Sequence, residues 1–542
     1  MPAEPQMSAV ERDKLEIDPD FDFREIARRP FESLTPNEIS MFKWSGVYHQ
    51  LQPTFFMIRL VTPGGLITSA QLRRAASLAR DYGQGELCIT TRQTLQFHWI
   101  RQQDIHKILD GMADVGMTTK NGCGDVTRNV VTCSLQGVCP HEVGTHVREL
   151  IRAIATDPEI RDRQRNLPRK HKISVAGCGR ACAQTLINCQ GWIPVTRTAA
   201  GGAEEEGWQF YAGGGLGARP YLAKRVFDWV PHELALPVTQ AVVESFRRHG
   251  DRRRRTHARL KIVVDLMGAR GFGDSVLSIL RERGVPGLDR IVPAADPQPD
   301  LAPAFLDGQE TLVQRDRALC TVRIQVPRSE LRAAQAEQLA DWADAYGRGE
   351  IMFTNRQNVE IRHVPAERTP ALLAAIHAAG FRTCGNERLP DVVACVGTTV
   401  CRMAAGDAPA ACRRLLDAFV GDRPFFESVG ALRINITGCP NNCAHAWVAD
   451  IGLRGKRIRT EGGGSVDGYD LYVGGSLAGA GRIGELVGDA AGTEVVEAVR
   501  RIVGLYVSRR ETPAERFSAF SARTPLDAFR QALYGPGQSG AL

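Results

Sequence analysis

The sequence predicts an α+β protein built from two pseudo-repeats, each a small α+β half followed by a larger α/β domain. Two observations support this prediction. First, similar segments recur in the same order, such as "RNVVTCSLQGVC" (128–139) and "PDVVACVGTTVC" (390–401). Second, strand-like and helix-like stretches alternate in the same way in both parts. A repeat of this length indicates a duplicated unit. The matched landmarks and their offsets are Arg92 and Arg356 (264), Cys133 and Cys395 (262), Cys178 and Cys439 (261), and Gly213 and Gly474 (261).

Each repeat opens with the same succession of elements. Residues 54–63 and 321–327 alternate apolar and polar side chains, as half-buried strands do. A helix that ends at glycine follows each strand, and a further strand and a second helix come next. This β-α-β-α order predicts two halves packed as one domain around a pseudo-two-fold axis. The expected ranges are helix 68–83, strand 85–100 and helix 104–116, and then helix 328–347, strand 349–364 and helix 368–380.

The stretch 272–315 is rich in proline, aspartate and alanine, which predicts a connector between the repeats. A chain of 542 residues is also too long for a single hydrophobic core. We therefore expect several domains. They are an N-terminal extension (1–42), a first small half (43–118), a first large domain (119–285), a linker (286–315), a second small half (316–387), a second large domain (388–520) and a C-terminal tail (521–542).

The composition, with 43% hydrophobic and 24% charged residues, is typical of a soluble globular protein. We find no secretory signal and no apolar run of about 18 residues, and so expect a cytoplasmic protein without a membrane segment. The net charge is +7, concentrated in residues 161–172 and 247–261. Because no aromatic residues interleave these basic runs, they favour a multi-carboxylate ligand or an acidic partner over nucleic acid.

Fourteen cysteines are many for a reducing compartment, where clustered cysteines indicate metal binding or catalysis. In the second repeat Cys395 and Cys401 form a C-x5-C pair, and Cys439 and Cys443 form a C-x3-C pair 37 residues later. Four thiolates from two loops suit a 4Fe-4S cluster or a structural zinc ion. Zinc sites favour tighter spacings, so the pattern favours iron and sulfur over zinc or thiols without metal.

The segments "VACVGTTVC" (393–401) and "TGCPNNCAHAWVADIGLRG" (437–455) resemble the sirohaem and 4Fe-4S motif of assimilatory nitrite and sulfite reductases. Four further segments occur in that family's order, so the resemblance covers roughly residues 40–500. It implies that the small halves are ferredoxin-like and that the large domains bind sirohaem, substrate and the cluster. The four segments are "TTRQTLQ" (90–96), "GDVTRNV" (124–130), "NLPRKHK" (166–172) and "GDRRRRTHARLK" (250–261).

The resemblance also implies roles for individual residues. Cys395, Cys401, Cys439 and Cys443 would hold the cluster, and Cys443 would bridge it to the sirohaem iron. A cationic cage would bind a small oxyanion, and a basic run would bind the eight carboxylates of sirohaem. The cage residues are Arg92, Arg128, Lys170 and Lys172, and those of the basic run are Arg252, Arg255, Arg259 and Lys261.

Substrate and donor are expectations of the same resemblance. Lys172 stands where nitrite-reducing members typically carry asparagine, and an extra cation suits the sulfite dianion. We therefore expect the six-electron reduction of sulfite to sulfide, with nitrite to ammonia as the alternative. Because the chain has no dinucleotide-binding motif, electrons should come from a separate ferredoxin or a flavoprotein subunit. A cobalamin-synthesis monooxygenase is a more distant alternative within the fold, and a non-catalytic electron carrier or a zinc-stabilised binding protein is the alternative from another class.

The first repeat departs from the family's pattern, because it carries a second cysteine set at almost the same spacing. Three interpretations stay open: a second 4Fe-4S cluster without catalysis, thiols without metal, or a second sirohaem-cluster site. The last is least favoured because the second repeat lacks the lysine pair and the arginine run. Tyr48 and Cys123 lie in segments that the family places near the haem. The second set is Cys133, Cys139, Cys178 and Cys182.

Overall fold

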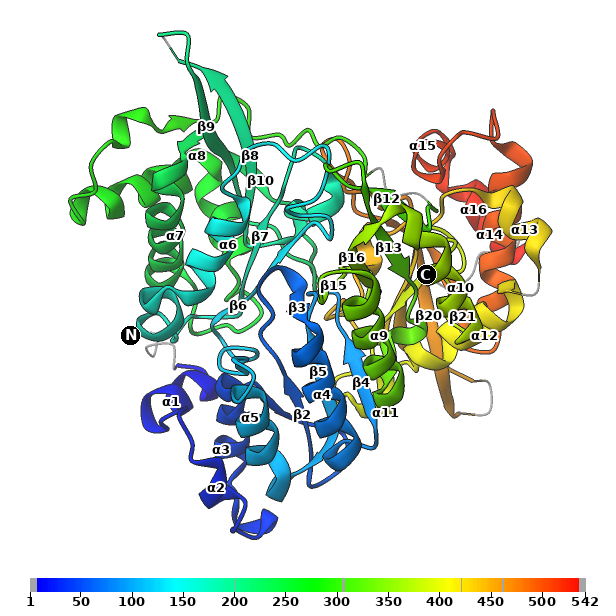
Figure 1. The fold of residues 1–542 in the computed structure, drawn as a ribbon, viewed down its shortest axis with the longest axis horizontal. Helices are drawn as coiled ribbons and strands as arrows, with labels where there is room; N and C mark the ends of the chain where they lie inside the picture. The colour runs from blue at the N-terminus through cyan, green and yellow to red at the C-terminus, as the bar shows by residue number, and fades with distance from the viewer. Residues whose placement is uncertain (1–6, 200, 305–307, 421, 461–462, 536–542) are drawn as a thin grey trace.

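The computed structural model describes residues 7–199, 201–304, 308–420, 422–460 and 463–535. Residues 1–6 of the predicted N-terminal extension, 305–307 of the predicted linker and 536–542 of the predicted tail lie outside the described residues. Figure 1 shows a mixed α and β molecule in which two small sheets lie between two larger ones. The predicted α+β class with two pseudo-repeats is confirmed.

The two small halves form one unit around a shared core, because each lends a strand to the sheet of the other. β14 pairs with β4 of the first half, and β3 pairs with β15 of the second half. Helices α4 (Ser69–Tyr82) and α9 (Ala333–Tyr346) contact each other across this unit. The first sheet has the order β1 (Val47–His49), β2 (Phe55–Arg59), β5 (Leu95–Arg101), β4 (Glu86–Ile89) and β14 (Glu330–Arg332). The second has the order β12 (Thr311–Val313), β13 (Leu319–Ile324), β16 (Val359–Pro365), β15 (Glu350–Phe353) and β3 (Leu66–Thr68).

The predicted strands 85–100 and 349–364 are each a hairpin instead of one strand. The first turns between β4 and β5, where Gln93 has φ 56°, and the second turns where Gln357 has φ 66°. A positive φ reverses the chain, and a polar turn inside an apolar run gives little periodic signal. The predicted second helices are confirmed as α5 (Ile105–Ala113) and α10 (Thr369–Ala378). The hairpin turns carry Arg92 and Arg356 to the edge of the small unit.

The two large domains share one sheet topology: three parallel strands followed by antiparallel ones. In Figure 1, α7 and α8 flank the first large sheet. The first sheet has the order β11 (Val292–Pro293), β10 (Lys224–Pro231), β9 (Glu204–Ala212), β8 (Gln190–Thr198), β7 (His171–Val175) and β6 (Thr127–Thr132). The second has the order β17 (Val392–Ala394), β18 (Ile434–Thr437), β19 (Ile451–Arg459), β20 (Ser465–Val473) and β21 (Glu485–Ala491). Helices of the first domain are α6 (Val147–Thr156), α7 (Ala235–His249) and α8 (Leu260–Glu282). Those of the second are α11 (Gly397–Val400), α12 (Ala408–Val420), α13 (Arg423–Val429) and α14 (Val495–Arg509).

This topology explains why distant cysteines meet. Cys133 directly follows β6, and Cys178 follows the neighbouring strand β7. Cys395 and Cys439 follow β17 and β18 in the same way. The carboxyl ends of adjacent parallel strands lie at one edge of a sheet, where α/β proteins place their ligands. Each repeat therefore brings its own thiols to one edge.

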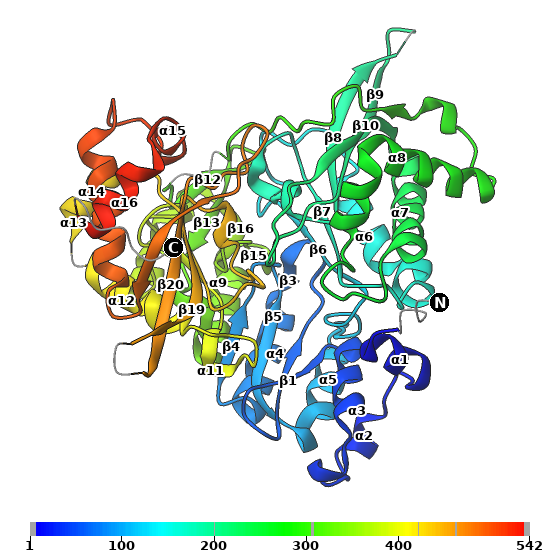
Figure 2. The same ribbon diagram turned by 180° about the vertical axis from the view of Figure 1, so that it is seen from behind.

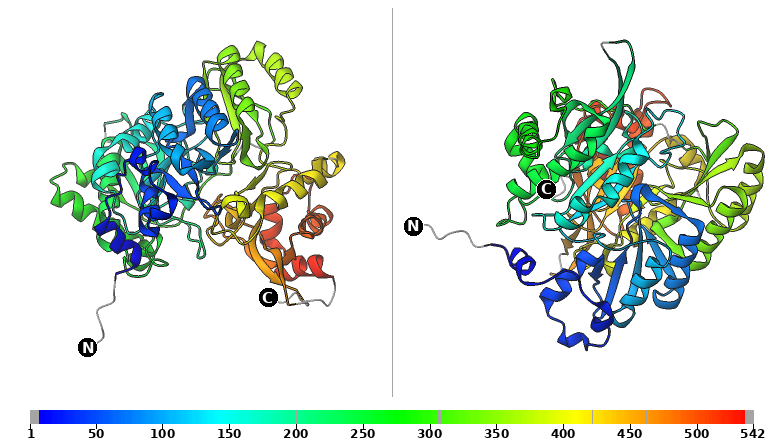
Figure 3. Two further views of the ribbon diagram at one scale, coloured as in Figure 1. Left: turned by 90° about the horizontal axis from the view of Figure 1, so that it is seen from below. Right: turned by 60° about the vertical axis from the view of Figure 1, so that its left-hand side comes forward.

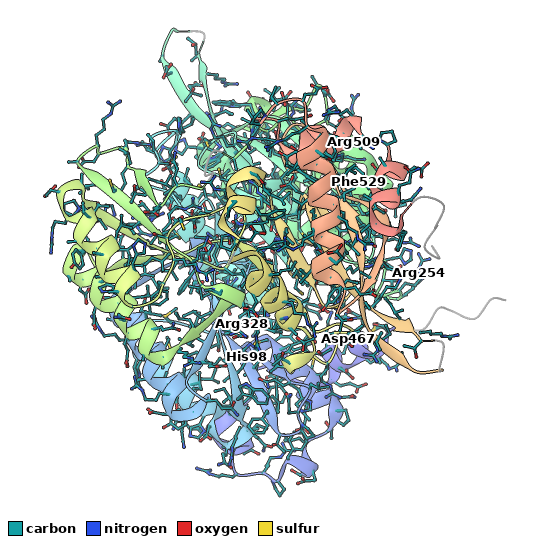
Figure 4. The ribbon with its side chains drawn as sticks, turned by 90° about the vertical axis from the view of Figure 1, so that its right-hand side faces the viewer. His98, Arg254, Arg328, Asp467, Arg509 and Phe529 are labelled. Carbon is teal, nitrogen blue, oxygen red and sulfur yellow. The ribbon has the colours of Figure 1, made fainter. Side chains whose placement is uncertain are left out.

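Both ends of the chain form helices that pack on the domains. The N-terminal helices α1 (Ala9–Glu16), α2 (Phe23–Ile26) and α3 (Pro36–Met41) lie beside the first half (Figure 2). The predicted C-terminal tail is wrong in part, because α15 (Phe517–Arg523) and α16 (Leu526–Tyr534) cover the second large domain (Figure 3). Phe529, labelled in Figure 4, is fully buried in that domain's core.

Two further features concern the predicted linker and the membrane. The linker contains β11, and also β12, which extends the second small sheet beyond its predicted start at residue 316. In the described ranges, no helix is long and apolar enough to cross a membrane.

Candidate functional site

The four cysteines of the second repeat come together at the edge of the second large sheet. The Sγ of Cys395 accepts a hydrogen bond from the Gly438 N–H at 3.1 Å. Burial, followed by the nearby Cys443, raises the pKa of Cys395 to about 12. Burial also raises the pKa of Cys401 and of Cys439, and each has Cys443 as a neighbour. Clustered thiols resist ionisation until a metal supplies positive charge, so this set suits a metal cluster.

Cys443 is the exposed member of this set. The Thr91 hydroxyl of the first small half donates to the carbonyl oxygen of Cys443 at 2.8 Å. Burial lowers the pKa values of Lys170 and Lys172 in the first large domain, and the nearby Cys443 sulfur acts in the opposite direction. Cys443 therefore lies where the two repeats meet, opposite the predicted cationic cage.

The four cysteines of the first repeat come together in the same way. A hydrogen bond between the Cys133 and Cys182 thiols, followed by burial, raises the pKa of Cys133. Burial raises the pKa of Cys139 to about 11, and Cys178 and Cys182 add to the effect. The Asn355 amide donates to the carbonyl oxygen of Cys182 at 2.7 Å, as Thr91 does in the other repeat. The group of four thiols and the side-chain contact to its last cysteine thus occur in both repeats.

No disulfide joins any of the fourteen cysteines, all of which belong to the described ranges. Within those ranges, no three His, Cys, Asp or Glu side chains converge on a single metal ion. A zinc site requires such a common centre, whereas a four-iron cube binds each thiolate on a different iron. Both thiol sets meet the ligand number of a cube.

The predicted cage residues also come together. Arg92 stands in the β4–β5 turn, and its Nη1 donates to Asn188 Oδ1 at 3.0 Å. Its buried Nε has no partner in the described part of the chain. Arg128 donates from Nη1 to the Gly122 carbonyl at 3.0 Å. Lys170 lies immediately before β7, and the charges that act on it most strongly are arginines and the Cys443 thiol, not carboxylates. The cage is therefore a set of cations without bound counter-charges.

These cations depress one another's pKa values. Burial, followed by the nearby Arg259, lowers the pKa of Lys170 to about 7. Burial, followed by Arg92, lowers the pKa of Lys172 well below its usual value. Burial lowers the pKa of Arg92 to about 9 and that of Arg128 to about 10. The lysines are only partly exposed, so burial and like charge act together. Such a site favours an anion strongly.

The predicted basic run divides into two groups. Arg252 donates from Nη2 to the Asn166 carbonyl at 2.8 Å and pairs with Glu11 of α1. Arg255 pairs with the buried Asp125 at 2.8 Å. These two arginines thus already have protein carboxylates as partners.

The second group of the basic run faces the glycine-rich loop. The Arg259 Nη2 lies 3.8 Å from the Cys189 Sγ, and its buried Nε has no partner in the described ranges. Lys261 donates to the carbonyls of Gly215 and Leu216 at 3.3 and 3.2 Å. A Cβ at Gly215 would lie 2.8 Å from the Arg259 guanidinium, so glycine permits this approach. Arg259 is therefore the member of the run most open to a ligand carboxylate.

The equivalent region of the second repeat is neutralised. Arg356, the counterpart of Arg92, pairs with Asp391 at 2.6 Å, and both side chains are buried. Arg433, in the place of Lys172, pairs with Glu387 at 2.7 Å. The second repeat thus pairs these cations with carboxylates, whereas the described residues of the first repeat show no such pair for Arg92 or Lys172.

Comparisons with known proteins match the whole architecture. The family model described as "Nitrite and sulphite reductase 4Fe-4S domain" matches residues 123–282 and 385–536. The model described as "Nitrite/Sulfite reductase ferredoxin-like half domain" matches residues 48–115 and 312–379. The chain belongs to the nitrite and sulphite reductase family. It is an oxidoreductase of that family, and its small halves are ferredoxin-like, as predicted.

Relatives in this family carry both enzyme names. An assimilatory ferredoxin-dependent nitrite reductase of Haloferax mediterranei is 33% identical over 86% of this chain and 81% of its own. The protein named sulfite reductase (ferredoxin) 2 of Mycolicibacterium paratuberculosis is 28% identical over 93% and 92%. The solved structure of the Mycobacterium tuberculosis NirA protein has a TM-score of 0.85 and 26% identity, covering 97% of this chain and 98% of that one. These similarities favour neither substrate.

The residues present fit the cofactors of a nitrite and sulphite reductase. The second thiol set places four free cysteines at one sheet edge, the number of ligands that a 4Fe-4S cluster takes. The unpartnered Nε atoms of Arg92 and Arg259 mark buried positive charge that an anionic macrocycle would compensate. Unpaired buried cations of this kind are retained where a ligand supplies the counter-charge.

Sequence reasoning missed several residues that the structure places beside the candidate site. Thr91 adjoins Arg92 in the same motif but gave no signal of its own. His445, two residues after Cys443, is buried, and burial followed by Lys172 lowers its pKa well below the usual value. Lys14 of α1 reaches Asp125 at 3.1 Å from a segment predicted only as an extension.

Tyr48 and Cys123 lie in segments that the family resemblance places near the haem, although packing is the default expectation for both. The Arg59 Nη1 donates to the Cys123 Sγ at 3.3 Å. Burial, followed by Cys401 and Cys123, raises the pKa of Tyr48. Tyr48 therefore lies near both Cys123 and Cys401, a member of the second repeat's thiol set.

Proposed function

We propose that this protein reduces sulfite to sulfide at a sirohaem coupled to a 4Fe-4S cluster. Cys395, Cys401, Cys439 and Cys443 would hold the cluster beside the sirohaem. The observation that carries the proposal is the position of Cys443, which is exposed and lies near Lys170 and Lys172, two lysines with no carboxylate partner in the described ranges. When bound, the cofactor pair would supply the electrons that reduce the oxyanion.

The chain's own residues would bind and orient that oxyanion. Arg92 is fixed by its hydrogen bond to Asn188, so its guanidinium presents a rigid donor to an oxygen. Arg128 is likewise anchored by the loop carbonyls of Gly122 and Gly124. Arg259 would bind a carboxylate of the sirohaem beside the glycine-rich loop. Preorganised donors of this kind bind developing negative charge without reorganisation.

The lysines would supply protons. The conversion of sulfite to hydrosulfide consumes six electrons and seven protons and releases three waters. A lysine with a pKa of about 7, such as Lys170, both donates and regains a proton near neutral pH. Lys172 lies beside it and would place a second positive charge on the dianion, which raises its own pKa again.

Nitrite reduction to ammonia is the second candidate. The relative at 33% identity carries that name, and nitrite fits the same cage. We favour sulfite because Lys172 adds a cation where nitrite-reducing members typically have asparagine. The relatives named above support ferredoxin as the electron donor, and no relative named above supports a flavoprotein subunit. A cytoplasmic location stays a prediction.

Steady-state assays of the purified, cofactor-loaded protein with a reduced dye test this function. We expect sulfite to yield sulfide with a higher kcat/KM than nitrite. Arg92→Met should abolish both activities, whereas Arg254→Met, at an exposed arginine that is not one of the four residues assigned to sirohaem, should leave them unchanged. Sirohaem absorption without reduction of either oxyanion would overturn the proposal.

A further inference from the structure

The first repeat's thiol set resembles the second in position and in contacts. Both sets follow adjacent parallel strands, and in both a side chain from the opposite small half binds the carbonyl of the last cysteine. Those side chains, Asn355 and Thr91, occupy equivalent positions in the two hairpin turns. The first set is thus held by the same construction as the second.

A buried arginine without sufficient partners lies behind this first set. Arg362 is 0% exposed, and its Nη2 donates to the carbonyl of Ser134, next to Cys133. Its Nε and Nη1 have no hydrogen-bond partner among the residues that the structure describes. Burial lowers the pKa of Arg362, while Glu360, Glu350 and the Cys133 sulfur act in the opposite direction. Arg362 therefore lies within electrostatic reach of the thiol set.

Carboxylates share this region with the arginines. Arg323 pairs with Glu360 at 3.3 Å, and Glu360 and Glu350 both act on Arg362. Glu350 also faces His363 at 3.2 Å. In the other repeat the same register places Arg59 opposite the neutral Gln96. An arginine therefore lies near each thiol set, Arg362 beside the first and Arg59 near Cys401 of the second.

A second sirohaem does not fit beside this set. The equivalent of the cationic cage is closed by the pairs Arg356–Asp391 and Arg433–Glu387. Apolar residues of both repeats, including Leu186, Trp447 and Tyr472, cover the thiols instead. This environment suits a cluster, and the counterparts of the cage cations are already paired with carboxylates.

We propose that Cys133, Cys139, Cys178 and Cys182 bind a second 4Fe-4S cluster that has no haem partner. The cluster would store one electron, taken from the reduced donor protein, and return it to the catalytic centre. Cys178 and Cys182 are partly exposed, which gives this cluster an accessible side. The site is independent of the substrate, so it stands whether the enzyme reduces sulfite or nitrite.

Metal analysis of the wild-type protein after anaerobic reconstitution with iron and sulfide is the first test. We expect about nine iron atoms per chain that contains one sirohaem, because two cubes hold eight. Reduction should produce two distinct cluster signals in electron paramagnetic resonance. About five iron atoms, one zinc ion, or a disulfide within the first set would each overturn the proposal.

Cysteine variants assign the additional iron. The double variant Cys133→Ser, Cys178→Ser should lose about four iron atoms and keep the sirohaem absorption. Cys384→Ser, at an exposed cysteine outside both sets, is the matched control and should lose none. Loss of sirohaem together with iron in the double variant, with unchanged size on gel filtration, would contradict an independent site.

The variant Arg362→Met tests for a cluster at the first thiol set, because thiols without a cluster would give no cluster reduction potential to shift. Removing the positive charge should lower the reduction potential of one cluster and leave the other unchanged. Equal shifts of both clusters, or no shift, would contradict the placement of the second cluster beside Arg362. His98 occupies the equivalent position in the first half, and His98→Leu is the matched control for the other site.

Discussion

The Thr91 hydroxyl of the first small half donates to the carbonyl oxygen of Cys443 at 2.8 Å. This bond joins one repeat to the cysteine loop of the other, next to the arginine of the cationic cage. It fixes the position of the exposed Cys443 thiol relative to Arg92. These two residues are 351 positions apart in the sequence. The site therefore depends on how the two repeats dock.

Thr91→Val should loosen the Cys443 loop. A neutral hydrogen bond contributes about 1 kcal/mol, so we expect roughly fivefold faster loss of the catalytic cluster to a chelator. Asn355→Ala removes the equivalent bond at Cys182 and should leave that rate unchanged. Equal effects of both variants on the catalytic cluster would show that the bond does not act locally.

The repeat, the thiol sets and the cage could be predicted because short sequence motifs specify each of them. The exchange of β3 and β14 could not, since strands of three residues carry no periodic pattern. The partners of Arg252 and Arg255 were also missed. These partners are Glu11 in α1 and Asp125 just before β6, and only tertiary packing brings the two carboxylates to the basic run. Local sequence patterns identify the candidate ligands, whereas the packing of distant segments determines which cations are paired with carboxylates.

Arg92 and Arg356 occupy equivalent positions, but their substitution should lower the free energy of unfolding to different extents. Arg356→Met leaves the Asp391 carboxylate buried without its cation, which costs about 3 to 5 kcal/mol. Arg92→Met removes a buried charge that has no carboxylate partner in the described ranges and loses hydrogen bonds to neutral acceptors only, so the cofactor-free protein should lose less stability than the Arg356 variant. Urea unfolding followed by circular dichroism measures both. A similar loss in the two variants would contradict the contrast between open and closed cations.

Lys172→Asn should shift the substrate preference towards nitrite. The variant loses one charge-assisted contact, worth about 1.5 to 3 kcal/mol, which matters more for a dianion than for a monoanion. We expect the ratio of kcat/KM for sulfite to that for nitrite to fall at least about tenfold. Lys120→Asn, at a surface lysine paired with Asp162, is the control. An unchanged ratio would remove the argument for sulfite.

Lys170 should make anion binding depend on pH. Its pKa in the folded protein is about 7, below its usual value, because of burial and the neighbouring Arg259. The ammonium form, which attracts the anion, is therefore present below pH 7 and is lost as the pH rises through 7. Nitrite keeps one charge across this range, so its affinity reports the protein alone.

We expect the Kd of nitrite, measured by the shift of the sirohaem absorption, to rise above pH 7 with a limiting slope of about tenfold per pH unit. Lys170→Arg keeps a positive charge throughout and should flatten this profile, whereas Lys170→Met should bind weakly at every pH. If the wild-type and Lys170→Arg profiles were parallel, another group would carry the titration. Bound carboxylates of the cofactor would move the midpoint upwards without changing the sign, since they stabilise the ammonium form.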